Sequence, residues 1–482
     1  MIRHFAKLPL MALAITAAVI AQPLAARPKM SEPADAAPAP IPTAWPKGEA
    51  YVLPSDAALP SYSYRDVLGD ARLVKLIDLA LAHNQDLAVA LANIETAQNQ
   101  YRVQRGALMP EIDVGAGYSH AEGDGTRVSG ATTKGDYASA TSTLASYELD
   151  LFGRVRGLTA ATKATYLATE AGSRATRLTL IANLANGWLT YASDRSLLKL
   201  AQDTAASAQT SVDLTRARLD GGIGLLADLR KAELTLRSAQ ADVAAQTNAV
   251  AQDLNALRLL AGADVPEDLL PTGLDDAASH LKPVPAGLDS SILLRRPDVM
   301  QSEFSLRAAE ANVDAARAAL YPKITLTGVT GFATLALGSL FTPANFAWGL
   351  SSAASYPIFK GGAAKANAKA VAATRDASLA TYRKTVQTAF QDVANVLARR
   401  GTIEAQIAAL QAARDAAQDN YRLVDLRYRG GVGTYLDALT AQQSLYASEK
   451  TLVAAKLTRA SNLVGLYRAI GGDAAAIPKR SS

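Results

Sequence analysis

The sequence of 482 residues contains no cysteine and only four histidines. Without cysteine there can be no disulfide scaffold, no cysteine-ligated zinc site and no thiol nucleophile. Four histidines leave little material for a histidine-rich metal site. His-Glu-x-x-His, Gly-x-Ser-x-Gly and the phosphate-binding Gly-Lys-Ser/Thr loop are also absent from the sequence. We therefore predict that the protein is not an enzyme and needs neither a metal nor another cofactor.

Charged and aromatic residues are scarce as well. Charged side chains make up 19% of the sequence and aromatic ones 6%, whereas hydrophobic residues reach 49%. An average domain has about 25% charged residues. A chain this apolar is not intrinsically disordered. The net charge is +5, but Arg3 and Lys7 lie in a predicted export signal. The mature chain then holds 47 basic against 44 acidic side chains, which is too even a balance to predict nucleic-acid binding.

Long apolar runs are missing after the first 26 residues. The segment 1–26 has a basic start, an apolar run over 8–20 and small residues after it, which is typical of a secretory signal peptide. That run is shorter than the roughly 20 residues of a membrane-spanning helix. Residues 27–64 read as an extended segment rich in proline and alanine, and 473–482 as a C-terminal tail. The sequence thus predicts export without a transmembrane helix.

An internal repeat organises the remainder of the chain. Gly221, Gly222 and Gly224 match Gly430, Gly431 and Gly433 at an offset of 209 residues, and Asp228 matches Asp437 at the same offset. We predict a first structural repeat over 65–262, an inter-repeat linker over 263–292 and a second repeat over 293–472. This repeat replaces the three domains that length alone would suggest.

Each repeat has the same predicted order of elements. A helix comes first, over 70–108 or 293–320, and ends before a proline that cannot continue it. A β-hairpin follows, over 111–151 or 323–359. A long helix without proline, over 154–220 or 363–429, then leads through a glycine turn, 221–224 or 430–433, into a last helix.

The predicted hairpins alternate between apolar and polar residues. Ile112, Val114 and Tyr118 share one face of a segment about ten residues long, and a corresponding stripe holds Trp348 and Leu350. This period predicts strands, and the length with one polar face is typical of membrane β-strands. The alternation breaks at two further residues, Leu144 and Val329. A soluble hairpin packed on helices remains the alternative at this point.

The long helices narrow the choice of architecture. A helix of 67 residues extends about 100 Å, far more than a compact domain holds. Four strands cannot close a barrel, and an open sheet edge cannot face lipid. Three copies would supply 12 strands, enough to leave a lumen. The pattern therefore predicts a trimeric tube, and the alternative from another class is a soluble periplasmic coiled-coil adaptor.

Several motifs resemble those of the trimeric outer-membrane factors, the TolC-like efflux channels. The specific combination is the run Glu148–Arg156 with Arg295-Arg-Pro-Asp298. Further matching stretches are 76–87, 284–288, 357–362 and 435–445. The chain looks closest to the branch paired with resistance-nodulation-division pumps, and the resemblance covers about residues 65–472.

The resemblance implies a mainly α fold with membrane β-strands. Long antiparallel α-helical coiled coils and four strands per chain would form, in a homotrimer, a 12-stranded β-barrel continuous with an α-helical tunnel. The implied function is a passive conduit for drugs or other toxic small molecules from periplasm to exterior. The implied partners are outer-membrane lipid, a periplasmic adaptor (membrane fusion protein) and an inner-membrane pump. Within the family, the alternative is the exit duct of a type I protein secretion system.

The chain departs from the family pattern at two positions. Many members of this branch carry a lipidated cysteine, but Gln22 stands where the lipobox would need it. We therefore expect anchoring in the outer membrane without an N-terminal lipid. Members commonly carry an acid where this chain has Thr440, so a second carboxylate ring beside Asp437 is not expected.

Candidate site residues lie around the two glycine turns. The turns themselves, 221–224 and 430–433, would dock the adaptor or pump at the periplasmic tip, and they would equally serve as helix C-caps. Asp437 would form a ring of three carboxylates at the aperture, or would only cap its helix together with Thr434. Tyr428 and Tyr435 would narrow the opening or, the favoured interpretation, pack between helices. Asp228 is the counterpart of Asp437 in the first repeat.

Overall fold

The computed structural model describes residues 63–121, 127–128, 131–132, 135–282 and 290–472. The predicted signal peptide, almost all of the proline-rich segment and the C-terminal tail lie outside these residues. Within the described part, no helix combines the length and the apolar character needed to cross a membrane. The chain divides into two compact units. The first holds the described parts of 101–162 and 307–377, and the second holds those of 63–100, 163–306 and 378–472.

The elements follow the predicted order in both repeats. They are α2 (Tyr64–Val67), α3 (Ala71–His83), α4 (Gln85–Gly106), β1 (Ile112–Ala121), β2 (Arg127–Val128), β3 (Ala131–Thr132), β4 (Gly135–Glu148), α5 (Arg154–Asp220), α6 (Leu226–Ala261), η1 (Glu267–Leu269), α7 (Leu274–Ala278), η2 (Ser290–Arg295), α8 (Pro297–Ala318), β5 (Lys323–Thr334), η3 (Leu337–Ser339), η4 (Pro343–Asn345), β6 (Phe346–Ser355), α9 (Ala363–Arg429) and α10 (Tyr435–Ala469).

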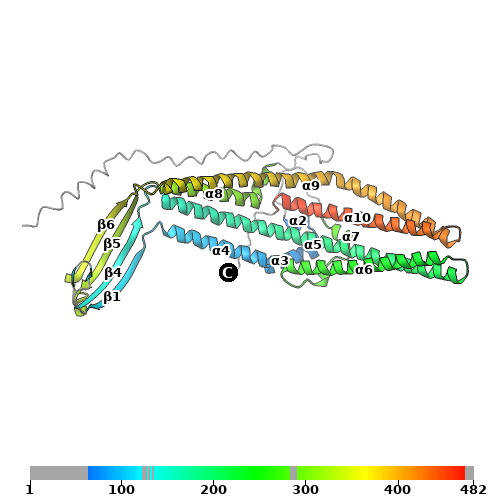
Figure 1. Cartoon of the computed structure of the whole chain (residues 1–482), viewed down its shortest axis with the longest axis horizontal. Helices are drawn as coiled ribbons and strands as arrows, with labels where there is room; N and C mark the ends of the chain where they lie inside the picture. The colour runs from blue at the N-terminus through cyan, green and yellow to red at the C-terminus, as the bar shows by residue number, and fades with distance from the viewer. Residues whose placement is uncertain (1–62, 122–126, 129–130, 133–134, 283–289, 473–482) are drawn as a thin grey trace, which may run out of the picture. The chain divides into compact units, whose positions relative to one another are not determined.

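The first unit contains a four-stranded antiparallel sheet in the order β1-β4-β5-β6 (Figure 1). Ile112 pairs with Leu144 at one end of the β1–β4 ladder, and Leu350 pairs with Gly328 in the β5–β6 ladder. Apolar side chains on the sheet remain exposed, with Val114 at 85%, Trp348 at 73% and Leu350 at 62%. In this single chain, the sheet therefore has an apolar face that nothing within the described residues covers.

A β-bulge lies directly after one break in the predicted alternation. The register between β4 and β5 shifts between Leu144 and Tyr147, and Ser146 has a φ of 40°. A bulge inserts an extra residue into one strand and redirects the side chains that follow it. Leu144, where the alternation fails in the sequence, lies at this shift.

Ion pairs hold the junction between β4 and α5. Arg154 donates two hydrogen bonds to the Glu148 carboxylate, at 2.8 and 2.7 Å, and Lys323 lies 3.3 Å from the same carboxylate. Arg156 donates to Asp150 at 3.2 Å. The charged residues of the Glu148–Arg156 run therefore have a structural role at this junction.

The prediction of one helix over 70–108 was wrong. The structure has two helices, α3 and α4, separated at Asn84, which has an extended backbone (φ −64°, ψ 129°). The Asn84 side chain accepts a hydrogen bond from Leu87 N at 2.9 Å and donates one to Leu260 O at 2.9 Å. Asparagine is a favoured N-cap residue, so its local hydrogen bond starts a new helix where a continuous one was expected. In the second repeat, the range 293–320 holds the end of η2 and then α8, which begins at Pro297.

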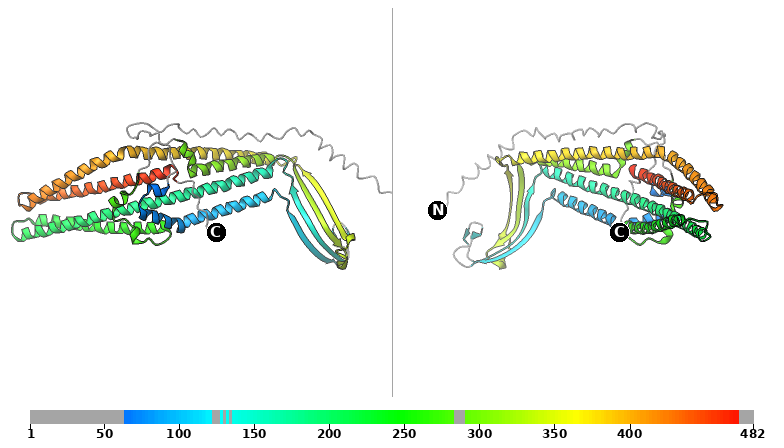
Figure 2. Two further views of the ribbon diagram at one scale, coloured as in Figure 1. Left: turned by 180° about the vertical axis from the view of Figure 1, so that it is seen from behind. Right: turned by 45° about the vertical axis from the view of Figure 1, so that its right-hand side comes forward.

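The second unit is built around two long helical hairpins. Figure 2 shows α5 running beside α6, and α9 running beside α10. Both α5 and α9 have 67 residues and the bounds that the sequence predicts, 154–220 and 363–429. The main core includes Trp188, which is fully buried and donates its indole N–H to Leu269 O at 3.0 Å. This bond ties the inter-repeat segment onto α5.

A buried arginine fixes the start of the second repeat. Arg296 donates to Asp298 at 2.7 Å, to Asp392 at 3.1 Å and to Ala469 O at 3.1 Å. It thereby joins the beginning of α8 to α9 and to the end of α10. A buried cation requires such partners, so the motif has a structural role here.

Candidate functional site

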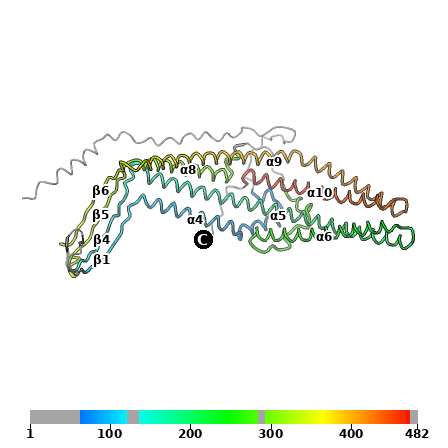
Figure 3. The backbone as a smooth tube through the Cα atoms, in the orientation of Figure 1, coloured from blue at the N-terminus to red at the C-terminus, as the bar shows by residue number. Residues whose placement is uncertain are grey.

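The two glycine turns close the ends of the helical hairpins (Figure 3). Gly222 and Gly431 have φ values of 76° and 81°, a backbone conformation that other residues rarely adopt. Gly224 lies so close to its own helix that a Cβ there would come 2.7 Å from Leu219 N, and for Gly433 the corresponding distance, to Tyr428 N, is 3.1 Å. Glycine is therefore required by both turns as helix C-caps.

Each turn also contains a third glycine, Gly221 or Gly430, and one large apolar residue, Ile223 or Val432. Gly221 and Gly430 donate their N–H groups to Ala217 O and Leu426 O, which continues each helix by one residue. Ile223 and Val432 project from the turns with exposed fractions of 83% and 73%. Each glycine turn, 221–224 or 430–433, thus presents one exposed large apolar side chain.

The first turn of α10 contains Asp437. Thr434 is the N-cap residue, and its hydroxyl accepts a hydrogen bond from Asp437 N at 3.2 Å and donates one to the Asp437 carboxylate at 2.7 Å. Asp437 is exposed. The capping role is therefore present in the structure, and it leaves the carboxylate accessible. Thr440, one turn further, bonds back to Leu436 O at 2.9 Å and supplies no second acid.

The first repeat differs at the same place. Leu225 occupies the N-cap position of α6 and provides no side-chain hydrogen bond. Asp228, the counterpart of Asp437, is half-buried and lies 3.9 Å from Lys231. The two aspartates are equivalent in sequence, but only Asp437 has both the N-cap hydroxyl contact and an exposed position.

Both tyrosines of the candidate site are buried between the hairpins. Tyr428 and Tyr435 have ring centroids 5.5 Å apart and pack in a cluster with residues of all four long helices. Burial raises the pKa of the Tyr435 hydroxyl to about 12. Their burial agrees with the favoured interpretation, packing between helices.

Arg218 joins the two tips. It lies at the end of α5 and donates to Tyr428 O at 2.7 Å and to Arg429 O at 3.2 Å, the last residues of α9. Its guanidinium also lies 4.4 Å from the centroid of the Tyr428 ring. A cation at a helix C-terminus is favoured by the helix dipole and by carbonyls that lack helical partners. The first hairpin therefore caps the second.

Further polar contacts connect the two hairpins along the long helices, away from the glycine turns. Ser207 on α5 bonds to the Tyr421 hydroxyl on α9 at 3.0 Å and accepts from Gln442 on α10 at 3.2 Å. Tyr446 on α10 donates to Asp242 on α6 at 3.1 Å. Sequence reasoning missed these residues and Arg218. They follow no motif, and the one signal available was the presence of tyrosines in otherwise alanine-rich helices.

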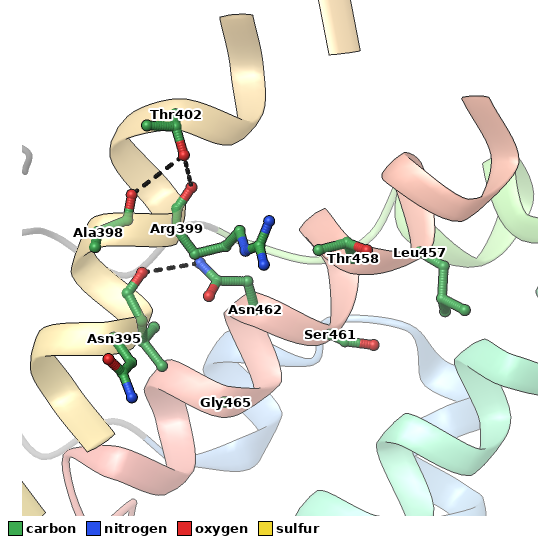
Figure 4. A pocket seen from close by; sticks show the side chains of 10 residues that line it. Asn395, Ala398, Arg399, Thr402, Leu457, Thr458, Ser461, Asn462 and Gly465 are labelled. Carbon is green, nitrogen blue, oxygen red and sulfur yellow. Dashed lines mark hydrogen bonds between the residues drawn. The ribbon is translucent and has the colours of Figure 1, made fainter. Parts of the chain in front are cut away.

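A groove lies between α9 and α10, away from the tips. Asn395, Arg399 and Thr402 line it from α9, and Ser461 and Asn462 line it from α10 (Figure 4). Within the described residues, no cluster of three or more histidine, aspartate or glutamate side chains could hold a metal ion.

Comparison with known proteins identifies the family. The model for the family described as outer membrane efflux protein matches residues 76–263 and 288–472. The chain is 38% identical over 441 residues to the probable efflux pump outer membrane protein TtgC of Pseudomonas putida, with 90% of each chain covered. It is 33% identical over 440 residues to outer membrane protein OprJ of Pseudomonas aeruginosa, again with 90% of each covered.

Solved structures agree with this assignment. The open state of the MtrE outer membrane channel of Neisseria gonorrhoeae is 35% identical, with a TM-score of 0.77 over 89% of this chain and 98% of that one. A membrane protein from Pseudomonas aeruginosa, 31% identical, reaches 0.80 over 89% and 97%. The predicted outer-membrane location and efflux function are thereby confirmed, and the family is one of channels rather than enzymes. This protein belongs to the outer membrane efflux protein family.

Proposed function

We propose that three copies of this chain form the outer-membrane channel of a tripartite efflux system. The channel would be a passive conduit carrying drugs or other toxic small molecules from the periplasm to the exterior. The observation that carries the trimer is the four-stranded sheet, which leaves β1 and β6 as edge strands and an apolar face exposed.

The need to pair the backbone groups of the two edge strands favours closure of the sheets of several copies into a barrel. Backbone N–H and C=O groups at a sheet edge cannot remain unpaired in lipid, because each costs several kcal/mol. Pairing β1 of one copy with β6 of the next satisfies both edges, and three copies give 12 strands. The exposed Val114, Trp348 and Leu350 would then face the acyl chains of outer-membrane lipid.

The helices would form the wall of a periplasmic tunnel. The equal lengths of α5 and α9, at the 209-residue offset, support the proposal that residues 65–262 and 293–472 are two copies of one unit joined by 263–292. Three pairs of such hairpins would alternate around the tunnel. Energy for transport would come from an inner-membrane pump of the resistance-nodulation-division type through a periplasmic adaptor.

The tips are the proposed docking and gating region. Gly221–Gly224 and Gly430–Gly433 present exposed apolar side chains on turns that require glycine, which suits contact with an adaptor or pump. Arg218 and the tyrosine cluster hold the two hairpins together at this level. We propose that separation of the hairpins widens the aperture, where the exposed Asp437 of three copies would form a carboxylate ring that favours cations.

The substitution Asp437→Ala tests the aperture role. We expect a higher single-channel conductance in planar bilayers and weaker cation selectivity, because the ring loses three negative charges. Thr434→Ala is the matched control, since it removes the same Thr434–Asp437 hydrogen bond but keeps the carboxylate. If both variants conduct like the wild type, Asp437 only caps its helix.

Cell fractionation tests the function as a whole. The proposal predicts that the protein is found in the outer membrane and that it runs as a trimer on a denaturing gel when the sample is not boiled. It also predicts increased drug susceptibility when the gene is deleted. A soluble monomer would refute the channel and support a coiled-coil adaptor. Loss of secretion of a protein substrate without any change in drug susceptibility would favour the exit duct of a type I system.

A further inference from the structure

Two carboxyl groups meet between α5 and α6, away from the tips. Asp194 on α5 and Asp253 on α6 are half-buried, and the contact between their side chains is one of the causes that shift the pKa of each. The Oδ2 atom of Asp253 is inaccessible to solvent and has no hydrogen-bond partner within the described residues. Buried polar atoms are normally paired, so this contact requires an explanation.

A shared proton supplies that explanation. Ionised carboxylates only accept hydrogen bonds, whereas a protonated carboxyl group can also donate one. Two carboxyl groups in contact therefore bond only when one carries a proton. Burial raises the pKa of both groups, and the neighbouring Asp194 charge adds to the effect on Asp253, whose pKa is about 6.

Three of the basic groups on the surrounding elements are paired with other carboxylates. On α5, Lys199 pairs with Asp203, and on α6, Arg258 pairs with Asp264. The helix α3, which packs on α6, carries Lys75, Asp78, His83 and Arg72, and Arg72 binds Asp70 and Asp276. Among the described groups, no basic side chain affects the pKa of either carboxyl group, so nothing there favours the doubly ionised state.

The second repeat lacks this pair. At the 209-residue offset, Asp194 corresponds to Ile403 and Asp253 to Asn462. Ile403 is buried, and Asn462 donates to Val396 O at 3.2 Å (Figure 4). The α9–α10 contact is thus satisfied without a titrating proton, whereas the α5–α6 contact is not.

We propose that Asp194 and Asp253 share a proton, and that loss of this proton loosens the pairing of α5 with α6. The device belongs to the first hairpin alone. It concerns the hairpin itself and does not depend on the transported substrate or on the partners.

The sign of the pH effect follows from the raised pKa values. Between about pH 4 and pH 6, the folded pair holds more protons than the unfolded chain, whose aspartates titrate near 3.8. The stabilisation is therefore complete below pH 4 and is lost as the pH rises through about 6. Above that, two carboxylates face each other in a partly desolvated contact.

Infrared spectroscopy on the full-length purified protein detects the proton directly. In the wild type, we expect the carbonyl band of a protonated carboxyl group to disappear between pH 5 and pH 7, and Asp253→Asn should remove this transition. The exposed Asp213 on α5 offers a matched control, because Asp213→Asn should leave the transition unchanged. If the wild type shows no carboxyl band titrating near pH 6, the proposal is overturned.

Hydrogen–deuterium exchange measures the structural consequence. After correction for the intrinsic pH dependence of exchange, peptides covering 186–200 and 246–260 should exchange at least several-fold faster at pH 7.5 than at pH 5 in the wild type. Peptides covering 395–409 and 455–469 in the second hairpin should not. Asp253→Asn, which provides a permanent hydrogen-bond donor, should abolish the difference. An unchanged pH dependence in this variant, or an equal effect in both hairpins, would contradict the proposal.

Discussion

Leu350→Arg should prevent the protein from assembling in the outer membrane. Leu350 lies in the middle of β6 with an exposed fraction of 62%, on the apolar face of the sheet. In the proposed barrel, that face contacts lipid, where an arginine at the bilayer midplane costs about 2–4 kcal/mol. Because each trimer carries three copies, the cost is paid three times. We expect the heat-modifiable trimer band to disappear from the outer-membrane fraction.

The neighbouring residue provides the control. Ser351 is also exposed, but alternation along the strand places it on the opposite, polar face. Ser351→Arg would point into a water-filled lumen, so trimers should form in near-normal amounts with altered ion selectivity. Equal loss of trimer in both variants would mean that β6 does not separate lipid from lumen.

Arg218→Met should separate the two helical hairpins at their tips. The arginine donates charged hydrogen bonds to Tyr428 O and Arg429 O and stacks on the Tyr428 ring, and methionine keeps much of the apolar contact but none of the donors. Hydrogen bonds from charged groups contribute about 1.5–3 kcal/mol. Discounted for partial exposure, their loss would shift the equilibrium toward separated hairpins about 10-fold. We expect a higher channel conductance and faster amide exchange at both turns.

Arg216→Met is the matched control for this effect. Arg216 lies half a turn away and pairs with Glu233 at 3.0 Å, within the first hairpin. Its replacement removes the same charge but preserves the link between hairpins, so conductance should stay near the wild-type value. If Arg218→Met conducts like Arg216→Met, the Arg218 contacts do not hold the aperture.

Local patterns in the sequence predict the long elements well. The helices at 154–220 and 363–429 have these bounds in the structure because they lack proline, end at glycine turns and occur twice at one offset. The strands can be predicted because apolar and polar residues alternate there with a period of two. A bulge directly follows Leu144, where the alternation fails. The packing of Tyr428 and Tyr435 between helices also follows from their position beside the turns.

Contacts between segments that are distant in the sequence could not be predicted from local patterns. Arg218 meets the end of α9 across 210 positions, and Ser207 meets Gln442 across 235, with no periodic pattern linking them. The break at Asn84 was missed because a single side-chain cap outweighed a continuous helical pattern. The Asp194–Asp253 pair depends on burial and on the facing of two helices, which composition does not reveal.

Disulfide cross-linking between strand edges tests the trimeric barrel most directly. The chain has no cysteine, so introduced thiols report on one contact alone. Gly117→Cys in β1 would be combined with a cysteine at Gly349, Ser351 or Ala353 in β6, all on the polar face. Within one chain, β1 and β6 are three strand spacings apart, about 14 Å, which is beyond the reach of a disulfide. For at least one pair of cysteines, we predict covalent dimers and trimers and no larger species. Monomers for every pair, or species larger than three chains, would contradict the trimeric barrel.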